Sequence, residues 1–354
     1  MNDSVWTNRK KLYLNLLFVA VIFFLTLWLV FRGEDPGDVA EYLSEADPRF
    51  VLLSILCVIF FILGESVIIN YLMRTLGQPV RFFHCCLYSF IGFFFSCITP
   101  SASGGQPMQV VAMHRVEIPV PVATVVLAIV TITYKLVLVV IGCAVFLIRP
   151  SRIMACLEPV EGVMVLGIVL NVACITLLLM LVFHPHFVKV AAARLMEMFC
   201  RIRPMSHPER QMERLERLTD QYHGTAEFYR THRHVMVQVF LITFLQRICL
   251  FLVTWFTYLA FGLPPEQMTV ILILQAMISV ASDMLPLPGG MGVSESLFLV
   301  IFLPFFGEEL ILPAMVLSRG IGYYTQLLIS ALMTAASSFI LKRDDGKRKE
   351  FSAT

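Results

Sequence analysis

The chain has 354 residues, of which 58% are hydrophobic and only 15% are charged, and its formal net charge is +2. Soluble globular domains carry roughly 45–50% apolar and about 25% charged residues. This composition excludes an ordinary soluble protein and indicates an integral membrane protein. Nine cysteines without a Cys-x-x-Cys pair support neither a disulfide framework nor a zinc site. We therefore expect no metal and no other cofactor.

Six apolar runs are long enough to cross a bilayer, which takes about 20 residues. The first is long and lacks a small-residue cleavage site, so we interpret it as a retained peripheral helix rather than a signal peptide. The expected spans are residues 12–31, 50–73, 119–148, 160–183, 236–262 and 311–341.

Two further regions, residues 82–118 and 267–306, are apolar but broken in the middle by proline and glycine. Their second arms are short, so we interpret each region as a re-entrant hairpin that enters and leaves on one side. With a cytoplasmic N-terminus, this threading places twenty Lys and Arg residues inside and four in outer loops, as the positive-inside rule requires. Two full crossings per region would give the same sidedness, so this alternative stays open.

The two broken regions resemble each other. SCITPSASGGQ and SDMLPLPGGM both contain Ser-x-x-x-Pro followed by Gly-Gly, and a cation, Lys135 or Arg319, follows at nearly the same distance. The regions have opposite orientation, and inverted repeats with interrupted helices are typical of transporters. In the alternative, each break is a short capped loop at the membrane surface.

The expected fold is therefore an all-α polytopic membrane protein with six spans and two oppositely oriented re-entrant hairpins. We expect a single domain over residues 1–354. After the peripheral span it comprises a first repeat (50–148), a span (160–183), a basic cytoplasmic loop with an amphipathic helix (184–235), an inverted second repeat (236–341) and a cytoplasmic tail (342–354).

A new helix should begin after each Gly-Gly pair, and its unpaired N–H groups and partial positive charge favour an anion. Serine and glutamine side chains beside the first pair would add hydroxyl and amide partners. The candidate substrate-binding residues are Ser101, Ser103, Gly104, Gly105, Gln106, Gln109, Lys135, Gly289, Gly290, Ser294, Glu295 and Arg319.

Six ionisable residues fall inside the spans or hairpins, and such residues must pair with one another or face a wet cavity. Mutual ion pairing is one interpretation. In the other, Lys135 and Arg319 contact a phosphate, while Glu295 either stabilises a helix start or meets an ammonium group. The remaining three are candidate cavity or gating charges: Glu65, Arg247 and Asp283.

TPSASGGQPMQ followed by a basic His-Arg pair, and PLPGGMGVSES followed later by SRGIGYY, resemble the transmembrane region of lysylphosphatidylglycerol synthases. The resemblance covers about residues 12–341. It implies a flippase-type fold that moves anionic or aminoacylated phospholipids, such as lysylphosphatidylglycerol, between leaflets. It also implies a bacterial cytoplasmic membrane with both termini cytoplasmic, and a link to antibiotic resistance.

Full-length synthases of this family append a soluble domain that transfers lysine from charged transfer RNA to phosphatidylglycerol. Only KRDDGKRKEFSAT follows the last expected span, so we expect no lysyltransferase activity. Many family members have an acid where this chain has Gln106, so no role that needs a carboxylate there is carried over.

The sequence thus predicts a phospholipid translocase with membrane phospholipids as partners and no nucleic acid. A homo-oligomer or a separate lipid-modifying synthase stays open as a partner. The alternatives are a transporter of another small anionic solute or lipid-linked precursor, and a membrane enzyme of lipid modification. No GxxxxGK[ST] motif is present, so any driving force should come from gradients, membrane potential or downhill flow.

Overall fold

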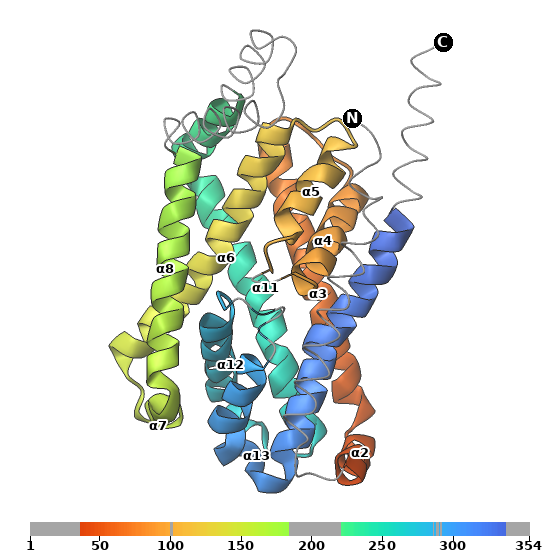
Figure 1. Cartoon of the computed structure of the whole chain (residues 1–354), viewed down its shortest axis with the longest axis vertical. Helices are drawn as coiled ribbons and strands as arrows, with labels where there is room; N and C mark the ends of the chain where they lie inside the picture. The colour runs from red at the N-terminus through yellow and green to blue at the C-terminus, as the bar shows by residue number, and fades with distance from the viewer. Residues whose placement is uncertain are drawn as a thin grey trace, which may run out of the picture.

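The computed structural model describes residues 36–99, 102–183, 221–285, 287, 290 and 292–337, and within these ranges it contains helices and no strand (Figure 1). The predicted span 12–31, the tail 342–354 and most of the loop 184–235 lie outside the described residues. So do two candidate site residues, Ser101 and Gly289.

The helices follow one another with short connections. They are α2 (Pro36–Glu45), α3 (Pro48–Thr75), α4 (Phe82–Cys97), α5 (Gly105–His114), α6 (Val120–Ile148), α7 (Ser151–Leu157), η2 (Glu158–Val160), α8 (Glu161–Phe183), α11 (Arg233–Ala260), η3 (Pro265–Gln267), α12 (Met268–Ser282), α13 (Val293–Arg319) and the π-helix η5 (Gly320–Thr325). Residues 221–231 and 326–337 are also helical.

Six helical stretches are long and apolar enough to cross a membrane: Pro48–Thr75, Val120–Ile148, Ser151–Phe183, Arg233–Ala260, Pro265–Ser282 and Val293–Ser337. Four of them coincide within a few residues with the predicted spans 50–73, 119–148, 160–183 and 236–262. The protein is therefore an all-helical, multi-pass membrane protein. Pro265–Ser282 meets the length criterion although we had assigned it to a hairpin arm.

Local chemistry explains where the long helices begin. Asp47 caps α3 by accepting a hydrogen bond from the Arg49 N–H at 2.8 Å, and Pro48 occupies the first helical position. Proline also lies in the first turn of α6, where its missing N–H removes no helical hydrogen bond.

The first broken region forms two short helices, α4 and α5, that pack against each other. Gly105 allows this close approach, because a Cβ there would lie 2.7 Å from the backbone oxygen of Gly92 and would overlap the Ser96 hydroxyl. The chain leaves helical geometry between them, where Ala102 adopts a left-handed conformation with φ of 52°.

The second broken region forms α12 and the first arm of α13. A turn with two left-handed glycines, Gly290 and Gly292, precedes α13. Gly307, with φ of 73° and ψ of 172°, then separates α13 into two arms. The first arm lies beside α12 in the lower half of the molecule, and the second runs upward along its length into η5 (Figure 1).

The helices form one bundle in which α11 packs on α3, and α12 packs on α6, α8 and α11. The contact between α8 and α12 is especially close, because a Cβ on Gly167 would lie 2.6 Å from the Val280 carbonyl oxygen. The buried Asn171 side chain donates to that same oxygen at 3.1 Å. The amide therefore fixes the helix pair by an interhelical hydrogen bond.

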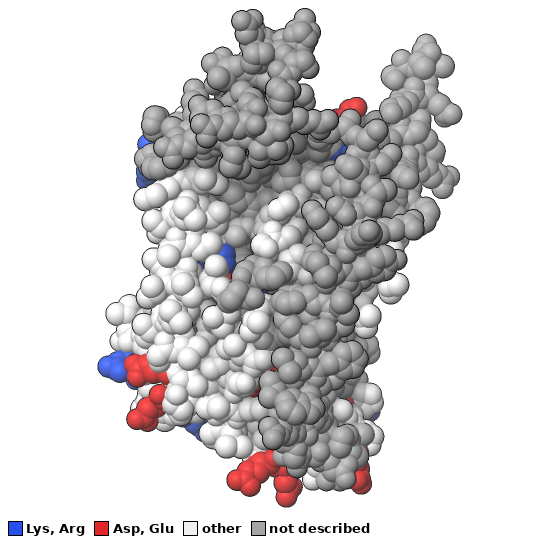
Figure 2. All heavy atoms as spheres, in the orientation of Figure 1, with Lys and Arg blue, Asp and Glu red and all other residues white. Residues whose placement is uncertain are grey.

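The predicted amphipathic helix of the basic loop is described only over residues 221–231. Its Tyr222 and Tyr229 are buried and donate to the carbonyl oxygens of Leu181 and Leu72, whereas Glu227 and Arg230 are exposed. This segment thus packs one face on the end of the bundle. Figure 2 shows charged groups gathered at the lower end of the molecule and an uncharged surface above them.

Candidate binding cavity

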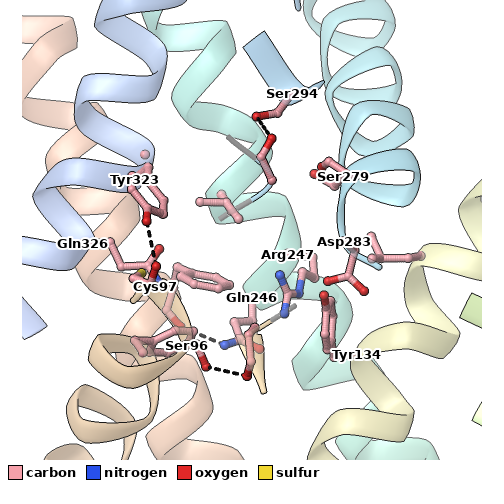
Figure 3. Close-up of a pocket in the computed structure, with 18 of the residues that line it drawn as sticks. Ser96, Cys97, Tyr134, Gln246, Arg247, Ser279, Asp283, Ser294, Tyr323 and Gln326 are labelled. Carbon is pink, nitrogen blue, oxygen red and sulfur yellow. Dashed lines mark hydrogen bonds between the residues drawn. The ribbon is translucent and has the colours of Figure 1, made fainter. Parts of the chain in front are cut away.

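A cavity of about 270 Å³ lies in the middle of the bundle (Figure 3). The first broken region contributes Ser96, Ala102, Gln106 and Gln109 to its wall. The second contributes Ser282, Asp283, Gly290 and Ser294. Helices α3, α6 and α11 and the π-helix η5 complete the lining. Both irregular stretches of backbone therefore face one polar space, as non-helical backbone at membrane depth requires.

One ion pair joins the two halves of the chain at this cavity. Lys135 on α6 contacts Asp283, just after α12, with 2.6 Å between Nζ and Oδ2, and both side chains are largely buried. Asp283 lines the cavity and Lys135 does not. The ammonium group that we predicted to contact phosphate is thus already held by a carboxylate.

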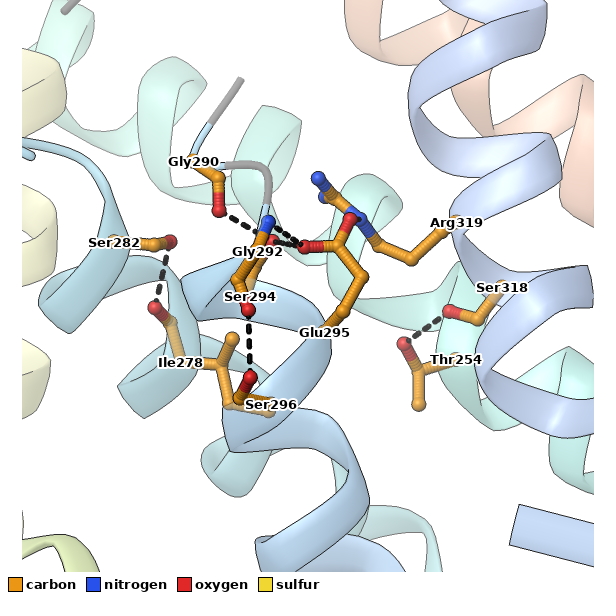
Figure 4. Close-up of polar contacts among 10 residues, drawn as sticks. All are labelled: Thr254, Ile278, Ser282, Gly290, Gly292, Ser294, Glu295, Ser296, Ser318 and Arg319. Atoms are coloured by element: carbon orange, nitrogen blue, oxygen red, sulfur yellow. Dashed lines mark hydrogen bonds and ion pairs between the residues drawn. The ribbon is translucent and has the colours of Figure 1, made fainter. Parts of the chain in front are cut away.

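A second ion pair lies at the start of α13 (Figure 4). Arg319 Nε contacts Glu295 Oε1 at 2.8 Å, and Glu295 is only 3% exposed. The other carboxylate oxygen accepts from the Gly292 N–H at 2.7 Å and lies 2.9 Å from the Ser294 hydroxyl. These contacts are those of a carboxylate that stabilises a helix start, and they fill the position where we expected an anion.

Arg247 on α11 is arranged differently. Its guanidinium carbon lies 3.7 Å from the centroid of the Tyr134 ring and 5.0 Å from that of Phe61. Within the described residues it forms no ion pair, and its buried Nε has no hydrogen-bond partner. Figure 3 shows its side chain in the cavity, near Gln246 and Tyr134. Aromatic faces stabilise the cation without neutralising it.

Glu65 on α3 is held by an amide rather than by a cation. Gln109 on α5 donates to its Oε1 at 2.6 Å. Glu65 and Arg247 are near enough to interact electrostatically, yet they do not form an ion pair. Two further glutamines tie the wall together: Gln106 donates to Thr131 at 3.1 Å and Gln246 to the Phe61 carbonyl at 2.8 Å.

The structure brings some of the predicted residues together and separates others. Those that line the cavity are Glu65, Gln106, Gln109, Arg247, Asp283, Gly290, Ser294 and Arg319. Those that do not are Ser103, Gly104, Gly105, Lys135 and Glu295. The first glycine pair lies away from the lining because Gly105 faces α4.

Several lining residues escaped the sequence analysis, namely Tyr134, Gln246, Gln275, Tyr323 and Gln326. Their polar groups join neighbouring helices: the Tyr323 hydroxyl donates to the Cys97 carbonyl at 2.8 Å, and Thr254 donates to Gln275 at 2.9 Å. Five glutamines line the cavity in all. A search for amide side chains within apolar runs would have found them, since such groups face the interior of a bundle.

Residues 14–330 match the family model described as "Lysylphosphatidylglycerol synthase TM region". The chain belongs to this family. All residues that line the cavity fall inside the matched range. A UPF0104 membrane protein of Methanothermobacter thermautotrophicus is also similar, with 26% identity over 115 residues. That alignment covers 32% of this chain and 32% of the relative, so it spans about a third of each protein.

Proposed function

We propose that this family member is a phospholipid translocase that moves an anionic or aminoacylated phospholipid, such as lysylphosphatidylglycerol or a related lipid, between leaflets. The observation that carries the proposal is the cavity, which both broken regions line and which contains a guanidinium group without a carboxylate partner among the described residues. A buried cation of this kind attracts the phosphate that every phospholipid headgroup carries.

The path for the lipid follows from the short helices. At about 1.5 Å per residue, α4 extends about 24 Å and α12 about 22 Å, less than the bilayer's hydrocarbon thickness of about 30 Å. We interpret α4–α5 and α12 with the first arm of α13 as re-entrant hairpins of an inverted repeat. Their positions in opposite halves of the molecule support this interpretation (Figure 1). Rocking of one repeat against the other would expose the headgroup to each leaflet in turn.

The acyl chains can remain in the bilayer while the headgroup crosses. Figure 2 shows a basic group at mid-height in a hollow of the otherwise uncharged flank. Such an opening faces the hydrocarbon region if the bundle crosses the membrane along its long axis. The charge bias of the loops supports a bacterial cytoplasmic membrane protein with both termini cytoplasmic.

Reconstitution tests the proposal. Purified protein is inserted into phosphatidylcholine vesicles containing a trace of phosphatidylglycerol labelled on an acyl chain, and dithionite then bleaches the outer leaflet. Active translocase exposes nearly all the label, whereas protein-free vesicles keep about half. Arg247→Gln should abolish the effect, and Arg149→Gln, at an exposed ion pair, should not.

Other outcomes would favour the alternatives. Label that stays protected would refute lipid translocation. Uptake of a small anion without lipid movement would indicate a solute transporter. Turnover of a lipid phosphate would indicate an enzyme of lipid modification.

A further inference from the structure

The charges around the cavity do not cancel in the same way. Lys135 is paired with Asp283 and Arg319 with Glu295, so these four are neutralised by direct contact. The remaining two, Glu65 and Arg247, both line the cavity, and neither belongs to an ion pair of the described residues. Keeping two opposite charges apart in a low-dielectric site is costly unless something lies between them.

Arg247 presents hydrogen-bond donors to the cavity. Its plane is covered by the Tyr134 ring, so its N–H groups point outward from the edges of the guanidinium. The edge of a guanidinium matches two oxygens of a phosphate. The carboxylates of Asp283 and Glu295 are held by other cations and do not compete for it.

Glu65 presents an acceptor to the same space. Gln109 is its one hydrogen-bond partner among the described residues, and it binds a single carboxylate oxygen. A primary ammonium group, with three donors, could bind the carboxylate beside this amide. Gln109 itself lies at the cavity wall and fixes the position of the carboxylate relative to α5.

We propose that the cavity selects a zwitterionic headgroup with one phosphate and one primary ammonium, as in phosphatidylethanolamine, and that Arg247 binds the phosphate and Glu65 the ammonium. The inference rests on the proposed function. A headgroup of zero net charge leaves the occupied cavity neutral. Phosphatidylglycerol would leave Glu65 beside an added anion, and a lysyl headgroup would add a second ammonium for which no unpaired carboxylate lines the described wall.

Leaflet exchange of three lipids tests this assignment. Phosphatidylcholine vesicles receive a trace of acyl-labelled phosphatidylethanolamine, phosphatidylglycerol or lysylphosphatidylglycerol, so that the headgroups stay unmodified. The wild-type protein should move phosphatidylethanolamine about tenfold faster than the other two, which is about 1.4 kcal/mol.

Two cavity variants separate the roles. Glu65→Gln should slow phosphatidylethanolamine about tenfold and leave phosphatidylglycerol unchanged or faster, so the preference disappears. Arg247→Gln should slow all three lipids. Glu65→Asp should restore part of the preference, because it keeps the carboxylate. Glu161→Gln makes the same change of an acid to its amide at an exposed site and should behave as wild type.

The outcomes distinguish this inference from the proposed function. Equal rates for phosphatidylethanolamine and phosphatidylglycerol, fastest movement of lysylphosphatidylglycerol, or an unchanged preference in Glu65→Gln would overturn the inference alone. Movement of none of the three lipids by wild-type protein would overturn both. If Glu65→Gln does not fold, the ranking of the lipids by the wild-type protein decides.

Discussion

Removing the carboxylate of Glu295 should destabilise the protein strongly. Glu295→Gln keeps the shape of the side chain but takes the negative charge from Arg319, whose Nε lies 2.8 Å away. The Glu295 side chain is 4% exposed and that of Arg319 21%, so solvent screens the remaining cation poorly. Breaking a buried pair by removing one partner costs about 3–5 kcal/mol. We expect a loss of that size in the free energy of unfolding.

The double variant Glu295→Gln/Arg319→Met shows whether the cost comes from the orphaned charge. It removes both charges, and replacement of a whole buried pair by an uncharged one is often nearly neutral. We therefore expect it to recover most of the stability lost in Glu295→Gln, giving a clear coupling energy in a double-mutant cycle.

Unfolding in mild detergent, followed by circular dichroism during titration with a denaturing detergent, gives the comparison. Glu161→Gln is the control, because its pair with Arg149 is long, at 3.9 Å, and exposed; it should change stability by less than about 1 kcal/mol. The reasoning is wrong if Glu295→Gln matches wild type, or if the double variant loses as much as the two single changes together.

Three further changes test packing at other places in the bundle. Gly167→Ala should drive α8 away from Val280 and lower the unfolding temperature markedly, whereas Gly162→Ala, with open space around it, should not. Gly105→Ala should separate α4 from α5, because its methyl group overlaps α4, and lipid movement in the vesicle assay should fall with it. Tyr229→Phe should cost about 1 kcal/mol of stability, since the hydroxyl donates a hydrogen bond to an α3 carbonyl at 2.8 Å; no measurable change in unfolding would refute that.

The long helices were predictable because membrane crossing is a constraint on length and composition. Residues 119–148 had to be apolar throughout, and α6 occupies nearly the same range. The break within 82–118 was equally visible, since proline and glycine interrupt it between α4 and α5. The left-handed Gly307 was missed, because a lone glycine after a phenylalanine-rich run carries little local signal.

The charges of the site were visible in the sequence, but their partners were not. An ionisable residue in an apolar run is conspicuous, and this found both Arg247 and Glu65. Lys135 and Asp283 are 148 positions apart, so only the packing of α6 against α12 brings them together. Tyr134 escaped notice for the opposite reason, since an aromatic residue in a membrane helix is ordinary until a guanidinium is found stacked on it.

The π-helix η5 changes how the last helix should be interpreted. A π-turn accommodates one more residue than an α-turn, so side chains beyond Thr325 are rotated by about 100° from the directions that an unbroken α-helix would give them. Gln326 reaches the cavity with the benefit of this offset. A helical wheel drawn in a single phase through Arg319 would therefore assign the wrong faces to residues 326–337. Loss of one residue between Gly320 and Thr325 would turn a different stripe of that segment toward the cavity.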